Sequence, residues 1–204
     1  LAVLHAYHPS LPLTYRSLLK TELKCGNVEM VGSGEYMHYG IMEGLLKHQH
    51  CIMNLNTTDV KYHVNIDGLP LYKSSSTQLW PILGRVVETQ CMFLIGAFCG
   101  TSKPSLIGVY LQKFIEEAKR LSTEGFMMNG KAFTANVMCI ISDAPARAYL
   151  KQIKGHTGYD GCERCVVKGT YLEGRLTFQS TESVKRNDCD FNLMKYEGHQ
   201  LDES

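Results

Sequence analysis

The stretch from Val137 to Cys165 constrains the fold of this chain more than any other part of it. It begins with an uninterrupted apolar run, Val137 to Ile141, which has the length of a strand that is covered on both faces. Asp143 follows where that strand ends. Pro145 and the helix formers after it predict a helix that starts at or just after Asp143 and stops at Gly155. Asp143 is therefore either an active-site carboxylate of a layered α/β fold or only the N-cap of this helix.

A second acid follows the first well-defined strand. Residues 59–69 alternate between apolar and polar side chains, which is the period of a strand, and Gly68 with Pro70 ends it. Asp67 thus lies at the carboxyl end of this strand, as Asp143 does on the later one. The alternative is that Asp67 is only a turn residue in an Asp-Gly hairpin.

Two further strands are predicted between these acids. The first, Gln78 to Gly84, contains Pro81, which indicates an edge position or a bulge. The second, Cys91 to Cys99, is apolar throughout, so we expect it to be central.

The longest helix comes next. Pro104 opens it, with Ser102 or Ser105 near the cap, and Gly125 ends it. A short hairpin around Asn129-Gly130 then leads into the Val137 strand.

The predicted order is strand, strand, strand, helix, strand, helix. Short links favour antiparallel pairing of the first three strands, and the strand-helix-strand step requires a parallel, right-handed crossover. This is the order of an α/β fold with a ribonuclease H-like mixed sheet, in which the first and fourth strands are neighbours. Asp67 and Asp143 should then lie together. We assign this core to residues 57–155.

Two appendages flank the predicted core. Residues 1–56 are expected to form a helical or irregular lead-in, with helices at 15–23 and 36–50 and a glycine-containing loop at 31–36. Residues 156–204 are expected to form a loop with a CxxC motif and a polar, truncated insertion.

Neighbouring carboxylates repel each other unless a cation neutralises them, and their hard oxygen atoms suit Mg²⁺ or Mn²⁺. Two such ions support phosphoryl transfer, because one activates the attacking water and the other stabilises the leaving oxygen. Asp67 and Asp143 are therefore candidate catalytic and metal-binding residues.

Cys162 and Cys165 follow a glycine-rich loop and have the spacing of half a tetrahedral zinc site. His156 is the nearest candidate for a further ligand, and His199 and Cys189 are more distant ones. Two other interpretations stay open. The thiols are either inert or a redox pair, although a thioredoxin-type motif belongs at a helix start after a strand.

The amino-acid composition excludes few classes of protein. The chain is 44% hydrophobic and 20% charged with a net charge of +1, so charge alone does not indicate a nucleic-acid or membrane partner. No apolar run reaches about 18 residues and no signal peptide is visible, so we expect no membrane span. Its 8 cysteines could form a secreted disulfide framework, but Cys91, Cys99 and Cys139 fall in predicted core strands, which favours a reducing intracellular compartment.

Three segments resemble the catalytic region of transposases of the En/Spm (CACTA) superfamily, in the form of transposon-derived proteins of animal genomes. They read HVNIDGLPLYKSSSTQLWPILG, CMFLIGAFCGTSKPSLIGVYLQKFIEEAKRL and IISDAPARAYLKQIKGHTGYDGCERC. Plant members are similar at the same places, with an Asp-Gly after the first strand, a Ser-Asp-x-Pro-Ala step and a histidine-glycine loop before CxxC. The likeness covers nearly the whole chain.

The resemblance implies a DDE-type DNA transposase that cuts and joins DNA with Mg²⁺ or Mn²⁺ in the nucleus. Asp67 corresponds to the first metal-binding acid, Asp143 to the second, and Cys162 with Cys165 to the family's cysteine pair. The family's later Asp-x-x-His motif and third acid have no counterpart in this chain, so we expect the chain alone to be inactive.

The implied partners are transposon-end and target DNA, bound by the full-length protein, and a homo-oligomer is a further expectation. The alternative function is a domesticated, catalytically inactive module that is stabilised by zinc and binds nucleic acid or protein.

Overall fold

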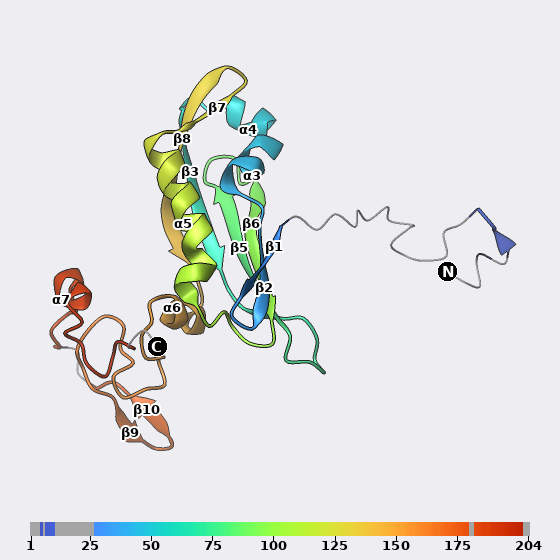
Figure 1. Cartoon of the computed structure of the whole chain (residues 1–204). Helices are drawn as coiled ribbons and strands as arrows, with labels where there is room; N and C mark the ends of the chain where they lie inside the picture. Colours follow the sequence, from blue (N-terminus) through green and yellow to red (C-terminus); the bar gives the residue numbers. More distant parts are fainter. Residues whose placement is uncertain (1–4, 6, 11–26, 180–181, 202–204) are drawn as a thin grey trace.

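The computed structural model describes residues 5, 7–10, 27–179 and 182–201. Its elements form a mixed α/β fold, and Figure 1 shows their arrangement. In chain order they are β1 (Val28–Val31), β2 (Gly34–His38), α3 (Ile41–Lys47), α4 (Gln49–Met53), β3 (Asp59–Ile66), β4 (Leu69–Pro70), β5 (Gln78–Val86), β6 (Met92–Gly100), α5 (Ile107–Thr123), β7 (Phe126–Met128), β8 (Lys131–Ile141), α6 (Ala144–Leu150), β9 (Thr170–Leu172), β10 (Arg175–Thr177) and α7 (Asp188–Asn192).

One mixed sheet carries most of the strands, in the order β1-β2-β6-β5-β3-β8-β7, with β4 paired to β5. β3 and β8 pair in parallel, whereas the other neighbours in this sheet are antiparallel. The predicted adjacency of the first and fourth core strands is therefore confirmed. α5 makes the crossover between β6 and the β7–β8 hairpin, packs against β8 and contacts α3.

β3 shows why the sequence forms a strand here. Every second side chain is fully buried in the core: Val60, Tyr62, Val64 and Ile66 are each 0% exposed. The side chains between them face the other side of the sheet and are more exposed. This period-2 burial confirms the strand predicted for this part of the chain.

β5 differs from its prediction in one respect. It lies between β3 and β6, so Pro81 is not on an edge strand. Pro81 is tolerated because it falls between two ladders: β4 pairs as far as Leu79, and β3 pairs from Ile82 onward. The pairing of β5 with β6 also shifts register after Ile82, which is the kind of irregularity that a proline indicates.

β8 is a strand, as predicted, but it is not covered on both faces. Met138 is 54% exposed and Ile140 is 53% exposed. The edge of β8 is open as well, because β7 pairs with only its first residues, up to Phe133, and no other strand among the described residues pairs with that edge. The apolar run of β8 therefore lines an open edge of the sheet.

The first part of the chain also differs from expectation. Residues 31–36, predicted as a loop, instead contain the end of β1, a two-residue turn at 32–33 and the start of β2, with Gly32 at a φ of 59°. β2 pairs with β6, so this hairpin extends the main sheet. The helix predicted over 36–50 begins only at Ile41 and is divided into α3 and α4. The helix predicted over 15–23 lies outside the described residues.

α5 begins at Ile107, later than the predicted start at Pro104, and neither predicted serine caps it, because Leu106 holds the N-cap position. Its inner face buries Tyr110, Phe114 and Leu121 against the sheet. Gly125 follows the helix with a φ of 71°, which favours glycine.

The β7–β8 turn has positive φ at both central residues, 49° at Asn129 and 76° at Gly130. The predicted hairpin is therefore confirmed.

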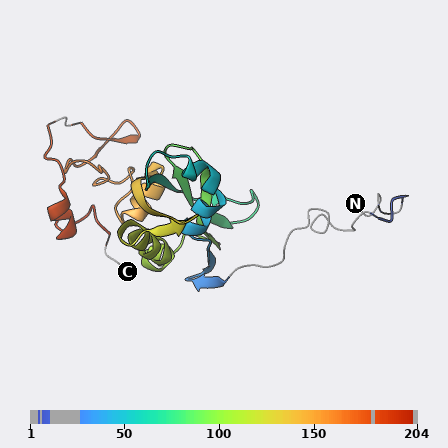
Figure 2. The same ribbon diagram turned by 90° about the horizontal axis from the view of Figure 1, so that it is seen from above.

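The chain after α6 forms a small unit beside the sheet, at the α6 end (Figures 1 and 2). α6 ends at Leu150, before the predicted stop at Gly155. Two backbone hydrogen bonds hold residues 199–201 beside the segment that follows α6. Lys154 N–H donates to the His199 carbonyl oxygen at 2.7 Å, and Leu201 N–H donates to the Gln152 carbonyl oxygen at 2.8 Å. No helix in the described part of the chain is long and apolar enough to cross a membrane.

Candidate functional site

The carboxyl ends of β3 and β8 bring the two predicted acids to one margin of the sheet. In the parallel register Asn65 is paired with Ile141, and each acid lies two residues beyond that pair. Both strands run toward α6 in Figure 1. Each acid therefore follows the end of its strand by the same number of residues, at the same margin of the sheet. Asn65 and Ile141 are 76 positions apart in the sequence, and the parallel pairing of β3 with β8 makes them neighbours.

Asp143 caps α6. Its Oδ1 accepts a hydrogen bond from the Ala146 N–H at 2.7 Å, and Pro145 stands in the first helical turn, where no N–H is needed. The carboxylate is nevertheless exposed. The helix-capping interpretation of Asp143 is confirmed, and it leaves the side chain open to solvent at the sheet margin.

Asp67 makes a local turn contact, in which its Oδ1 accepts from the Gly68 N–H at 2.8 Å. The strand after it, β4, pairs with β5 and not with β3, so Asp67-Gly68 does not join a two-strand hairpin. Within the described residues, Oδ2 of Asp67 and Oδ2 of Asp143 accept no hydrogen bond. Each acid therefore keeps one oxygen atom for another ligand.

Arg147 connects the end of β8 to the CxxC loop. Its Nη1 donates to the Ser142 carbonyl oxygen at 3.3 Å, and its Nε donates to Glu163 at 2.7 Å. Lys151, the C-cap residue of α6, donates to the other Glu163 oxygen at 2.5 Å. Burial would raise the pKa of the Glu163 carboxyl, but the bonds and charges of Lys151 and Arg147 lower it overall.

The two cysteines of the CxxC motif lie close together, with 3.1 Å between the Sγ atoms of Cys162 and Cys165. Burial tends to raise the pKa of the Cys162 thiol. The bond from Cys165, the N–H groups of Arg164 and Cys165, and the charge of Arg186 outweigh it and lower that pKa. The thiolate form is thus stabilised, which is what a metal ligand or a reactive thiol requires.

The predicted further ligands of a zinc site are not gathered around this pair. His156 and Cys189 are exposed, and His199 is buried with its Nδ1 at 2.6 Å from the Asp160 carbonyl oxygen. Burial lowers the pKa of His199, which favours a neutral imidazole. In the described part of the chain no three His, Cys, Asp or Glu side chains form a group that could hold a metal ion.

No disulfide joins the cysteines of the described ranges. The seven cysteines among the described residues are all free thiols, and Cys139, which was expected in the core, is exposed on β8. Cys91 and Cys99 are half-buried.

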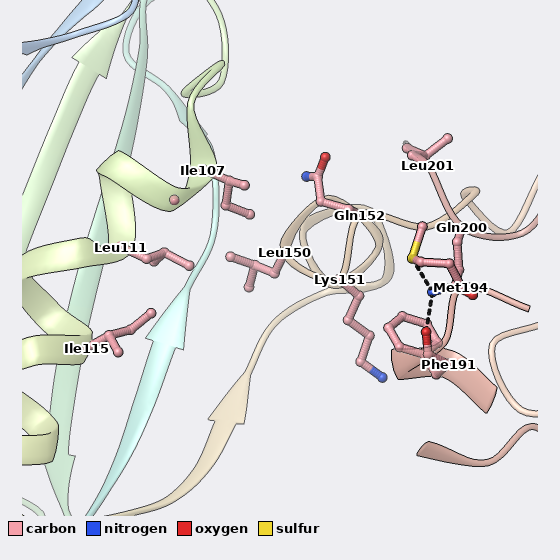
Figure 3. Close-up of a pocket in the computed structure, with 11 residues that line it drawn as sticks. Ile107, Leu111, Ile115, Leu150, Lys151, Gln152, Phe191, Met194, Gln200 and Leu201 are labelled. Carbon is pink, nitrogen blue, oxygen red and sulfur yellow. Dashed lines mark hydrogen bonds between the residues drawn. The ribbon is translucent and has the colours of Figure 1, made fainter. Parts of the chain in front are cut away.

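A groove of about 530 Å³ lies between α5 and the end of α6 on one side and residues 191–201 on the other (Figure 3). Ile107, Leu111 and Ile115 line it from α5. On the other side, Gln200 Nε2 donates to the Phe191 carbonyl oxygen and contacts the Met194 Sδ, which holds that wall together. A smaller apolar pocket of about 230 Å³ shares Leu111 and Ile115 with this groove and is also lined by Ile66 and Ile140.

Sequence reasoning did not identify a polar cluster that joins β2, α3 and α5. Glu117 accepts hydrogen bonds from the backbone N–H groups of Ile41 at 2.7 Å and Met42 at 3.1 Å, and it pairs with His38 Nε2 at 3.0 Å. The other His38 nitrogen is 3.0 Å from the Tyr36 hydroxyl. Burial would raise the pKa of Glu117, but these bonds lower it overall. No local motif could have indicated this cluster, because Glu117 is 79 positions from His38 in the sequence.

The sequence matches none of the protein-family models with which it was compared, and no curated protein matches it.

Proposed function

We propose that this chain is the core of a metal-dependent protein that cleaves and joins DNA strands, as in the DDE transposases that its sequence resembles. The main support is the parallel pairing of β3 with β8, which brings Asp67 and Asp143 to matching positions at one sheet margin. Two carboxylates at such a margin repel each other, and a hard divalent cation relieves that repulsion.

The ribonuclease H-like assignment of the fold has separate support in the strand order β6-β5-β3-β8. In this order β6, β5 and β3 are antiparallel neighbours, and α5 crosses over before β8 adds in parallel to β3. The same order was expected from the sequence for a fold of this class. The two acids then occupy the strand ends at which such a fold would carry its catalytic carboxylates.

The residues of the chain would have distinct parts in the reaction. Asp67 and Asp143 each offer an oxygen atom that no described backbone group uses, so they could bind Mg²⁺ or Mn²⁺. When bound, such ions supply Lewis-acid stabilisation of the charge that develops on the phosphodiester oxygens. The Oδ1 contacts to Gly68 and Ala146 would hold the two carboxyl groups in fixed orientations.

The CxxC pair fits a structural zinc ion only in part. The Cys162 thiolate is stabilised, and both sulfur atoms are close enough to share one ion. The described residues add no third ligand to this pair. Zinc at this loop, DNA as the substrate and the nucleus as the place of action remain parts of the proposal.

A second candidate function is an inactive scaffold in which the fold persists without catalysis. The observation that favours it is the local use of both carboxylates, since Asp67 closes a turn and Asp143 caps α6 without any need for an ion. The two candidates differ in whether divalent cations bind at this margin.

Calorimetric titration with Mn²⁺ separates the candidates. The variants are Asp67→Asn and Asp143→Asn, because asparagine keeps the Oδ1 acceptor and removes the charge. Asp59→Asn is the matched control, since Asp59 begins the same strand, β3, at its other end and accepts a bond from Asn136. The metal-dependent function predicts at least about a tenfold loss of affinity in the first two variants only. Equal Mn²⁺ binding in all of these proteins would favour the scaffold.

A further inference from the structure

A pocket of about 280 Å³ lies between α6 and the CxxC loop. Ala144, the residue after Asp143, lines it at one side, and Cys162 and Arg164 line it at the other. Because Asp143 is the N-cap of α6, the pocket reaches the residue that directly follows this acid. It is separate from the apolar groove of Figure 3, which lies between α5 and residues 191–201.

The pocket carries an excess of positive charge. Arg147, Lys154 and Arg164 line it together with one acid, Glu163. Glu163 is already neutralised, since Arg147 and Lys151 both form ion pairs with it. No acidic side chain in the described part of the chain forms an ion pair with Lys154 or Arg164, and both are exposed. Their charges are therefore available to an anionic ligand.

An aromatic side chain completes the lining. Phe178 lies just after the β9–β10 hairpin, is half-buried, and contributes to the pocket wall. Cations that follow a backbone, combined with an aromatic ring on which a base can stack, are typical of sites for single-stranded nucleic acid. A simple phosphate site would not need the ring, and an apolar ligand would not need the cations.

We propose that this pocket binds a single-stranded nucleic-acid segment next to the acid pair, with Lys154 and Arg164 on its phosphates and Phe178 stacked on one base. The proposal rests on the proposed function for its position beside Asp143. It adds the strandedness of the substrate and the residues that hold it. His156, which also lines the pocket, would be close to the same strand.

The test is the fluorescence anisotropy of a labelled thymidine oligonucleotide, single-stranded or annealed to its complement, titrated with the full chain in EDTA. Lys154→Ala and Arg164→Ala should each weaken single-strand binding several-fold and reduce the slope of log affinity against log salt by about 0.7 per lost phosphate contact. Phe178→Ala should weaken it by about five- to 100-fold, whereas Phe178→Tyr should retain binding, because tyrosine keeps the aromatic face.

Lys119→Ala on α5 is the matched control, since it removes one exposed positive charge from the half of the helix far from α6. Circular dichroism of every variant checks that the fold is retained. The proposal is overturned if Lys119→Ala weakens binding as much as Lys154→Ala does, if Phe178→Ala binds like the unchanged protein, or if duplex is bound more tightly than the single strand.

Failure of this proposal can be told apart from failure of the proposed function, because EDTA removes divalent ions from the binding measurement. Asp67→Asn and Asp143→Asn should bind the oligonucleotide at least as tightly as the unchanged protein, since each removes a negative charge beside the pocket. If the oligonucleotide binds through the pocket but Mn²⁺ does not bind, the proposed catalytic function is wrong and the nucleic-acid site stands. If Mn²⁺ binds through Asp67 and Asp143 but the pocket variants bind the oligonucleotide normally, only the nucleic-acid site is wrong.

Discussion

Asn65 of β3 faces Ile141 of β8, and its side-chain amide donates a hydrogen bond of 3.1 Å to the Ile141 carbonyl oxygen. This side-chain bond reinforces the parallel pairing at the last register position before the two acids. A side chain on one strand thus fixes the backbone of the other where the candidate site begins.

Loss of this bond should loosen the strand ends. We expect Asn65→Ala to lower the free energy of unfolding by about 1 kcal/mol, which is the usual net contribution of one hydrogen bond. It should also weaken Mn²⁺ binding, though less than Asp67→Asn does. Urea denaturation measures the first effect and calorimetry the second. Asn56→Ala, at an exposed position before β3, is the control. An equal effect of both alanine variants would contradict the role given to Asn65.

The cap of α6 predicts a difference between two substitutions at one position. Asp143→Ala removes the acceptor of the Ala146 N–H and should lower the free energy of unfolding by about 0.5–2 kcal/mol. Asp143→Asn keeps that acceptor and should be nearly as stable as the unchanged protein. Urea denaturation of both variants checks this. If the two lose the same stability, the cap does not contribute as described.

Glu117 predicts a pH dependence of stability. Its pKa is lowered in the folded protein, so its stabilising effect is present above the unfolded value of about 4.3 and is lost as pH falls through the folded pKa. At pH 7 we expect Glu117→Gln to be less stable than the unchanged protein by about 1–3 kcal/mol. This difference should shrink steadily as the pH is lowered below about 4.

Chemical denaturation at a series of pH values measures this difference. Glu116→Gln, the neighbouring exposed acid, is the control and should show little effect at any pH. A constant difference between the Glu117→Gln and unchanged proteins from pH 7 to acid would contradict the assignment of the lowered pKa to the bonds of His38, Ile41 and Met42.

Cys162 should react as a thiolate at lower pH than an ordinary cysteine. Iodoacetamide labelling in EDTA, followed residue by residue with peptide mass spectrometry, should give a midpoint below the ordinary thiol value of about 8.5. Arg186→Gln should raise that midpoint, because it removes a positive charge near the sulfur. Arg175→Gln, on β10, should leave it unchanged. A midpoint at or above the ordinary value would mean that the CxxC thiols are inert.

Much of the sheet could be predicted from the sequence because its determinants are local. The alternation in β3 gave its buried face, and a strand-helix-strand step requires the parallel pairing with β8. The burial of β8 could not be predicted in this way. An apolar run indicates a strand, but whether that strand has a neighbour on both sides depends on other parts of the chain.

The candidate site was predicted to a similar extent. Asp67 and Asp143 stood out because each follows a strand. The pairing of Glu117 with His38, which are 79 positions apart, has no counterpart in any local pattern. Lys154 and Arg164 were not identified from the sequence, because only the fold brings them to one pocket with Phe178.

Anomalous diffraction from crystals soaked in Mn²⁺ would show directly whether Asp67 and Asp143 bind one cation together. We expect an ion at the margin where β3 and β8 end, coordinated by oxygen atoms of both Asp67 and Asp143 and absent from crystals of Asp143→Asn. Crystals in which the two carboxylates point apart, with Mn²⁺ bound only elsewhere or not at all, would contradict it.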